Sequence, residues 1–139
     1  MRRLSDLRAS ELAEIFRGDE RILVAYLFGS KSRGLQTPGS DTDLAILLSE
    51  IPTDMLDYYL DLVYRLSRVV GGSIDLVFLN AASPLLKHQV IKHGKILYSR
   101  DETARVEFEA KAIKEYMDFI PRSDEYDEAL VEEISKWKG

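Results

Sequence analysis

Three short apolar segments constrain the fold more than any other feature of this chain. They occupy residues 22–28 (ILVAYLF), 44–48 (LAILL) and 73–79 (SIDLVFL). Short apolar runs that are rich in β-branched and aromatic residues, and that end at glycine or at polar residues, are typical of buried strands. The sequence therefore predicts a small central sheet that must be covered by other elements.

The segments around these strands have the spacing of helices. The clearest predicted helix is 53–70, in which apolar residues recur at intervals of three and four until Gly71 and Gly72 end it. Another spans 4–16, and Ser83 and Pro84 provide the cap and first turn of a third that ends at Gly94. A short strand is expected at 95–98, followed by helices at 101–120 and 124–137. The last of these places Tyr126, Leu130, Ile134 and Trp137 on one side.

This order of elements predicts an α/β (α+β) fold with a small mixed central sheet flanked by helices. A length of 139 residues suits one domain of ordinary size. We therefore expect a single domain over residues 1–139, with a core at about 20–100 and C-terminal helices at about 101–137.

The composition excludes several classes of function. The chain has no cysteine, which rules out disulfides, thiolate metal sites and cysteine nucleophiles. Its net charge of −5 argues against general nucleic-acid binding, which needs clustered Lys and Arg. There is neither a signal peptide nor an apolar run long enough to span a bilayer, so we expect no membrane association and a cytoplasmic location.

A candidate phosphate-binding turn follows the first predicted strand. Gly29 lets the backbone turn sharply and lets a ligand approach closely. Ser30 then stands where a short helix could begin, and free N–H groups at such a position attract phosphate. Arg33 and Ser40 are further candidates for contacts with a bound nucleotide.

Three aspartates are candidate metal ligands and catalytic residues. Asp41 and Asp43 are two positions apart at the start of a strand, so both carboxylates can point to one face. Asp75 interrupts another apolar strand, where burying an unpaired carboxylate would be costly. Oxygen ligands of this kind suit Mg²⁺, which bridges protein carboxylates and substrate phosphates. The alternatives without a catalytic role are that Asp41 caps a turn and that Gly29 and Ser30 form an ordinary turn at the end of a strand.

This pattern resembles a family signature. Gly29-Ser30, ten residues and then Asp41-Thr42-Asp43 is similar to the Gly-Ser-x10-Asp-x-Asp motif of the polymerase-β-like nucleotidyltransferase superfamily. Within it, the chain most resembles the minimal nucleotidyltransferase (MNT) group, because Gly29 to Gly34 matches that group's Gly-Ser-x-Ala-Arg-Gly loop except at Ser32. The resemblance covers about residues 22–101, including the stretch HGKILYSRD.

The resemblance implies a function. Members of this group act as antitoxins of HEPN ribonuclease toxins, by transferring AMP from ATP to a tyrosine of the toxin. It also implies that Gly29 and Ser30 hold the triphosphate, that Asp41 and Asp43 bind metal, and that Asp75 binds metal and helps to deprotonate the acceptor. Two alternatives stay open: neutralisation of the toxin by stoichiometric binding without catalysis, and nucleotide transfer to the hydroxyl of a small molecule.

Overall fold

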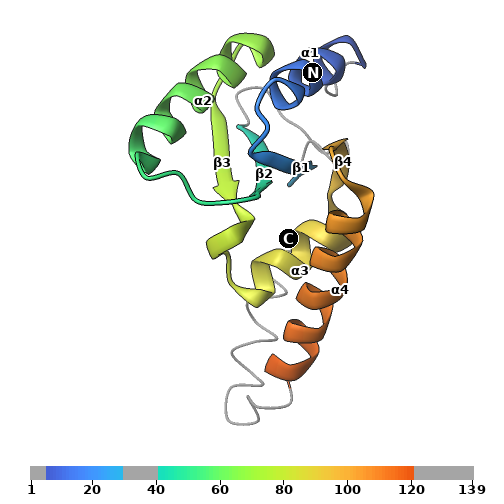
Figure 1. The fold of residues 1–139 in the computed structure, drawn as a ribbon. Coiled ribbons are helices and arrows are strands. Elements are labelled where there is room, and N and C mark those ends of the chain that lie inside the picture. Colours follow the sequence, from blue (N-terminus) through green and yellow to red (C-terminus); the bar gives the residue numbers. More distant parts are fainter. Residues whose placement is uncertain (1–5, 30–40, 121–139) are drawn as a thin grey trace.

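The computed structural model describes residues 6–29 and 41–120, and their arrangement is drawn in Figure 1. In chain order the elements are α1 (Asp6–Arg17), β1 (Ile22–Phe28), β2 (Thr42–Leu48), α2 (Met55–Val70), β3 (Ile74–Phe78), the short 3-10 helix η1 (Leu79–Ala81), α3 (Pro84–His93), β4 (Lys95–Ser99) and α4 (Glu102–Phe119).

The strands form a mixed sheet in the order β3-β2-β1-β4. β1 is antiparallel to both β2 and β4, whereas β2 and β3 are parallel and are connected through α2. A parallel pair needs such a crossover because the chain must return to the same end of the sheet. The second and third predicted strands are therefore neighbours, as the candidate site requires.

Helices cover both faces of the sheet (Figure 1). On one face, α1 and α2 pack through residues that include Phe16, Leu62 and Leu66 against the alternate positions of β2. On the other face, α3 and α4 pack through Val90 and Phe108. Burial on both faces explains why the strands read as continuous apolar runs rather than as alternating ones.

The predicted fold class is confirmed, and the predicted elements agree with the structure to within a few residues. The main difference is β2, which begins at Thr42 rather than at Leu44. The apolar pattern starts at Leu44, but the ladder is set by backbone pairing, and the N–H of Thr42 already donates to the carbonyl of Ser73 at 3.0 Å. η1 was not predicted. The predicted helix at 124–137 lies outside the described residues.

No helix within residues 6–29 and 41–120 combines the length and the apolar character needed to cross a membrane.

Candidate functional site

The candidate site lies at one end of the sheet, where strands of opposite direction bring distant residues together. Phe28, the last residue of β1, pairs with Asp43 near the start of β2. On the other side of β2, Asp43 pairs with Asp75, the second residue of β3. Three segments therefore meet at this end of the sheet. They contribute the predicted site residues Gly29, Asp43 and Asp75.

Asp43 and Asp75 form the central pair of the site. They occupy the same register position on adjacent parallel strands, so their side chains leave the sheet on the same face. Asp43 is half-buried and Asp75 is exposed, while Leu44 next to Asp43 is fully buried in the core. This alternation directs the carboxylates away from the core that holds Leu44.

Gly29 packs directly against the Asp43 carboxyl group. Its φ of +76° lies in the left-handed region, which L side chains rarely adopt. A Cβ at this position would overlap Oδ2 of Asp43 and would lie 3.0 Å from its Cγ. Glycine is therefore required twice, for the turn that ends β1 and for the close approach of the backbone to Asp43.

Asp41 lies just outside β2 and is exposed. The bond from the N–H of Thr42 to the carbonyl of Ser73 fixes the backbone beside it to the start of β3. Strand alternation does not extend to Asp41, so the structure joins Asp43 with Asp75 and leaves Asp41 adjacent to them along the chain.

The expectation that Asp75 is buried is wrong. β3 is one of the two outer strands of the sheet, and Asp75 is exposed near its beginning. Burial therefore gives no argument for a function of Asp75. The argument rests instead on its register with Asp43. The predicted nucleotide-binding residues Ser30, Arg33 and Ser40 lie outside the described residues.

The carboxylate oxygens of Asp43 and Asp75 are suitable ligands for a hard cation such as Mg²⁺. Within residues 6–29 and 41–120, no group of three or more His, Asp or Glu side chains is placed to hold a metal ion. A complete protein cage is not needed for Mg²⁺, which is commonly held by one or two carboxylates together with substrate phosphates. Asp43 and Asp75 provide two such carboxylates in one register.

Lys95 lies at the same end of the sheet as Asp43, but on the other face. It begins β4, is exposed, and pairs with Leu27 of β1. Because directly paired residues share a face of the sheet and Leu27 packs in the core beneath α1 and α2, Lys95 leaves the sheet on that face. Asp43 leaves on the opposite face, since its neighbour Leu44 packs beneath α1 and α2. Lys95 is therefore directed away from the two carboxylates.

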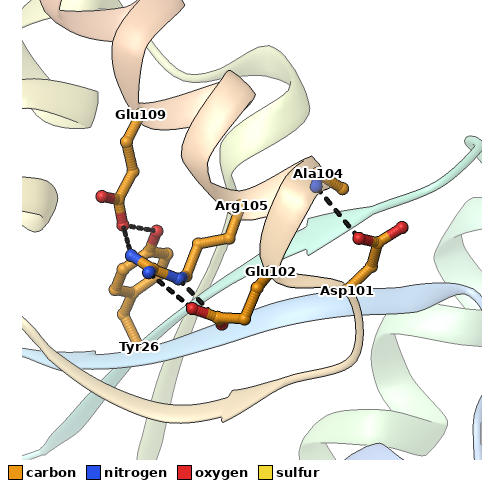
Figure 2. A network of polar contacts seen from close by, with 6 residues as sticks. All are labelled: Tyr26, Asp101, Glu102, Ala104, Arg105 and Glu109. Atoms are coloured by element: carbon orange, nitrogen blue, oxygen red, sulfur yellow. Dashed lines mark hydrogen bonds and ion pairs between the residues drawn. The ribbon is translucent and has the colours of Figure 1, made fainter.

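A polar network fixes α4 to the centre of the sheet (Figure 2). The hydroxyl of Tyr26, a buried residue of β1, donates to Glu109 at 2.7 Å. Arg105 also bonds Glu109 at 3.0 Å and forms a second ion pair with Glu102 at 2.7 Å. Burial and the neighbouring Glu109 raise the pKa of Tyr26, so this phenol stays protonated and serves as a hydrogen-bond donor.

His88 of α3 stacks on Tyr116 of α4, with ring centroids 3.8 Å apart and planes inclined by 9°. Burial, with smaller contributions from Lys92 and His93, lowers the pKa of His88. It is half-buried between α3 and α4, so its role in the fold is to pack these helices.

Comparisons with known proteins agree with this geometry. The family model described as polymerase beta, nucleotidyltransferase matches residues 10–103. The protein adenylyltransferase MntA of Shewanella oneidensis is 29% identical over 114 residues, which cover 81% of this chain and 80% of that protein.

Solved structures are similar over almost the whole chain. One chain of a toxin–antitoxin complex with AMP-PNP is 26% identical, with a TM-score of 0.70 over 95% of this chain and 99% of that chain. A chain from the complex of a Shewanella oneidensis MNT antitoxin with tri-AMPylated HEPN toxin has the same TM-score and coverage at 23% identity, which establishes the fold alone. From the match of the family model and the arrangement of the Gly29 turn, Asp43 and Asp75, we conclude that this chain belongs to the polymerase beta nucleotidyltransferase family.

Proposed function

We propose that this protein is an antitoxin that transfers AMP from ATP to a tyrosine hydroxyl of a HEPN ribonuclease toxin, in a reaction that depends on Mg²⁺. The observation that carries the proposal is the pairing of Asp43 with Asp75 beside the Gly29 turn. A turn that approaches phosphate, next to two carboxylates that hold a divalent cation, is the arrangement that nucleotide transfer requires. The proposal takes residues 1–139 as one domain that acts in the cytoplasm.

The nucleotide would bind at the end of β1. Gly29 and Ser30 would hold the triphosphate, with Arg33 and Ser40 as further contacts. Asp43 and Asp75 would hold Mg²⁺, and Asp41 is the third candidate ligand. Bound there, Mg²⁺ supplies charge stabilisation to the phosphates.

The transfer replaces a phosphoanhydride bond of ATP by a phosphate ester bond at the same phosphorus. The tyrosine oxygen forms a bond to the α-phosphorus of ATP, and the bond from that phosphorus to the pyrophosphate oxygen breaks. The phenolic proton must leave as the oxygen attacks. Asp75 is suited to accept it because Asp75 is exposed at the sheet edge, while Asp43 is half-buried against Gly29.

Two relatives support the choice of acceptor. MntA, with which this chain shares 29% identity, is a protein adenylyltransferase. The similar toxin–antitoxin complex was crystallised with AMP-PNP, an analogue of ATP. Because the likeness covers four-fifths or more of each chain, we extend the adenylyl donor and the protein acceptor to this chain.

Intact-mass spectrometry tests the proposal. The purified protein is incubated with ATP, Mg²⁺ and its candidate HEPN partner, and both chains are weighed. We expect a mass gain of one or more AMP units on the partner, and no gain with the Asp41→Ala/Asp43→Ala variant. Asp57→Ala is the matched control, since Asp57 is an exposed acid in the first turn of α2, outside the site.

The two alternative functions give different results in this experiment. A protein that acts only by stoichiometric binding would leave both masses unchanged but would form a stable complex and inhibit the toxin without ATP. A transferase for small molecules would leave the partner unmodified and unbound, and would release pyrophosphate only when a small hydroxyl compound is added. Either result would replace the proposed function.

A further inference from the structure

One side of α4 carries a row of exposed apolar side chains. The row consists of Val106, Ala110, Ile113 and Met117, which we call the α4 seam. The exposed fractions are 54% for Val106, 41% for Ile113 and 64% for Met117. Intervals of four, three and four residues keep these side chains on one side of a helix. The same alternation of intervals is typical of the line along which two helices pair.

The other side of α4 packs against the body of the protein. Phe108 contacts the core cluster that includes Val24 of β1 and Val90 of α3, and Ala112 is buried. Figure 1 shows α4 beside α3, at the outside of the part of the chain that the structure describes. The seam therefore faces away from this core, and contiguous exposed apolar surface of this kind is typical of a contact between proteins.

The seam is symmetric about its own midpoint, which lies between Ala110 and Ile113. If a second α4 runs in the opposite direction about this point, residues that face each other have numbers that add to 223. Val106 of each chain then faces Met117 of the other, and Ala110 faces Ile113. Each contact joins a smaller and a larger apolar side chain, which favours close packing. A two-fold dimer requires a surface that is complementary to itself in this way.

The charges beside the seam are complementary in the same arrangement. Glu107 and Lys114 are exposed on the same flank of the seam, before and after its midpoint. In the antiparallel pair, Glu107 of each chain is displaced by about 3 Å along the axis from Lys114 of the other, within reach of these side chains. Lys114 bonds Asp118 of its own helix at 3.2 Å, but such an exposed pair is weak and can be exchanged. Opposite charges thus meet twice in the dimer, which favours a second copy as the occupant.

We propose that this protein forms a two-fold symmetric dimer in which the α4 seams of two copies pack antiparallel. The inference rests on the exposure and symmetry of the seam and on the charges beside it. It does not depend on the proposed function. No residue of the seam or of its charged flank is a candidate site residue, so the failure of one proposal leaves the other intact.

Sedimentation equilibrium of the purified full chain tests the dimer. Between about 1 μM and about 1 mM, the average mass should rise from that of one chain to that of two. Ile113→Asp places a charge in the contact and should stay monomeric, whereas Lys111→Asp, at an exposed position outside the seam, should dimerise as the wild-type protein does. Urea unfolding verifies that both variants are folded. A wild-type chain that stays monomeric would refute the proposal, as would a dimer that Ile113→Asp leaves intact.

A charge exchange tests the antiparallel arrangement. Lys114→Glu should raise the dissociation constant of the dimer at least about 5-fold, since it replaces two attractive contacts by two repulsive ones. Glu107→Lys should have the same effect. The double variant Glu107→Lys/Lys114→Glu restores both pairs with their charges reversed, so its dissociation constant should return to within about 2-fold of the wild-type value. A double variant that dimerises as weakly as the single variants would show that these flanks do not meet.

A disulfide trap tests the register. The chain has no cysteine, so Val106→Cys and Met117→Cys each place a single thiol in a chain. In a mixture of the two variants these thiols face each other, and we expect a covalent dimer with one chain of each. In either variant alone the two thiols of a dimer lie about 16 Å apart along the helix axis, too far for a disulfide. Covalent dimers that form as fast in the separate variants as in the mixture would refute the register.

Discussion

Replacing Gly29 by alanine should separate the two requirements that the structure places on this residue. The first is conformational, because a φ of +76° costs an L residue about 1–2 kcal/mol of folding free energy. The second is spatial, because the new Cβ overlaps Oδ2 of Asp43. The carboxylate must move by about 1 Å to restore a normal contact distance. A displacement of that size at a catalytic group can reduce the rate about 100-fold.

Gly71 offers a matched control. Its φ is +71°, so Gly71→Ala bears the same backbone strain, but a Cβ there has open space around it. Both variants should therefore lose about 1–2 kcal/mol in urea unfolding. Only Gly29→Ala should also lose about 100-fold in the initial rate of AMP transfer, measured with labelled ATP at a temperature where both variants are folded.

The reasoning is refuted if Gly29→Ala retains the transfer rate of Gly71→Ala. That result would mean that the contact between Gly29 and the Asp43 carboxylate does not position a catalytic group. Equal loss of activity in both variants would attribute the effect to stability or backbone strain rather than to the site.

Three further predictions concern the scaffold. Tyr26→Phe should lower the free energy of unfolding by about 1–2 kcal/mol in urea titrations, because the bond to Glu109 is lost; an unchanged midpoint would contradict this. Asn80→Ala should cost about 1–3 kcal/mol in the same assay, since its amide bonds both the N–H and the C=O of Leu48 at the end of β2. Because burial lowers the pKa of His88 from its ordinary 6.5, the folded state binds fewer protons there than the unfolded chain. The contribution of neutral His88 to the free energy of unfolding should therefore be fully present above about pH 6.5 and be lost as the pH falls below that value. In His88→Phe the free energy of unfolding should depend less on pH in this range.

Much of the fold could be predicted from local signals. The apolar segment at 22–28 has the bounds of β1, and Ser83 caps α3 by accepting from the N–H of Leu86. Such features are fixed by residues close in sequence, which is why pattern and capping rules identify them. The start of β2 was placed two residues late because Thr42 and Asp43 are polar, and only backbone pairing with β1 and β3 includes them.

The site was predictable in its composition but less so in its geometry. The spacing of Gly29, Asp41 and Asp43 singled out the segment between β1 and β2 as a candidate, but the register that joins Asp43 to Asp75 is a property of the sheet. The burial expected for Asp75 failed because sequence pattern does not tell an edge strand from a central one.

The central claim is that Asp43 and Asp75 act as one site for AMP transfer, and the transfer rate of Asp75→Asn tests it most directly. Asn keeps the size of the side chain and removes its charge at an exposed position, so the fold should be unaffected. We predict a loss of at least about 100-fold relative to both the wild-type protein and Asp57→Asn, with the binding of the partner retained, because a positioned general base contributes that much. A rate equal to that of Asp57→Asn would contradict the account. It would mean that Asp75 pairs with Asp43 in the sheet but does not contribute to the transfer.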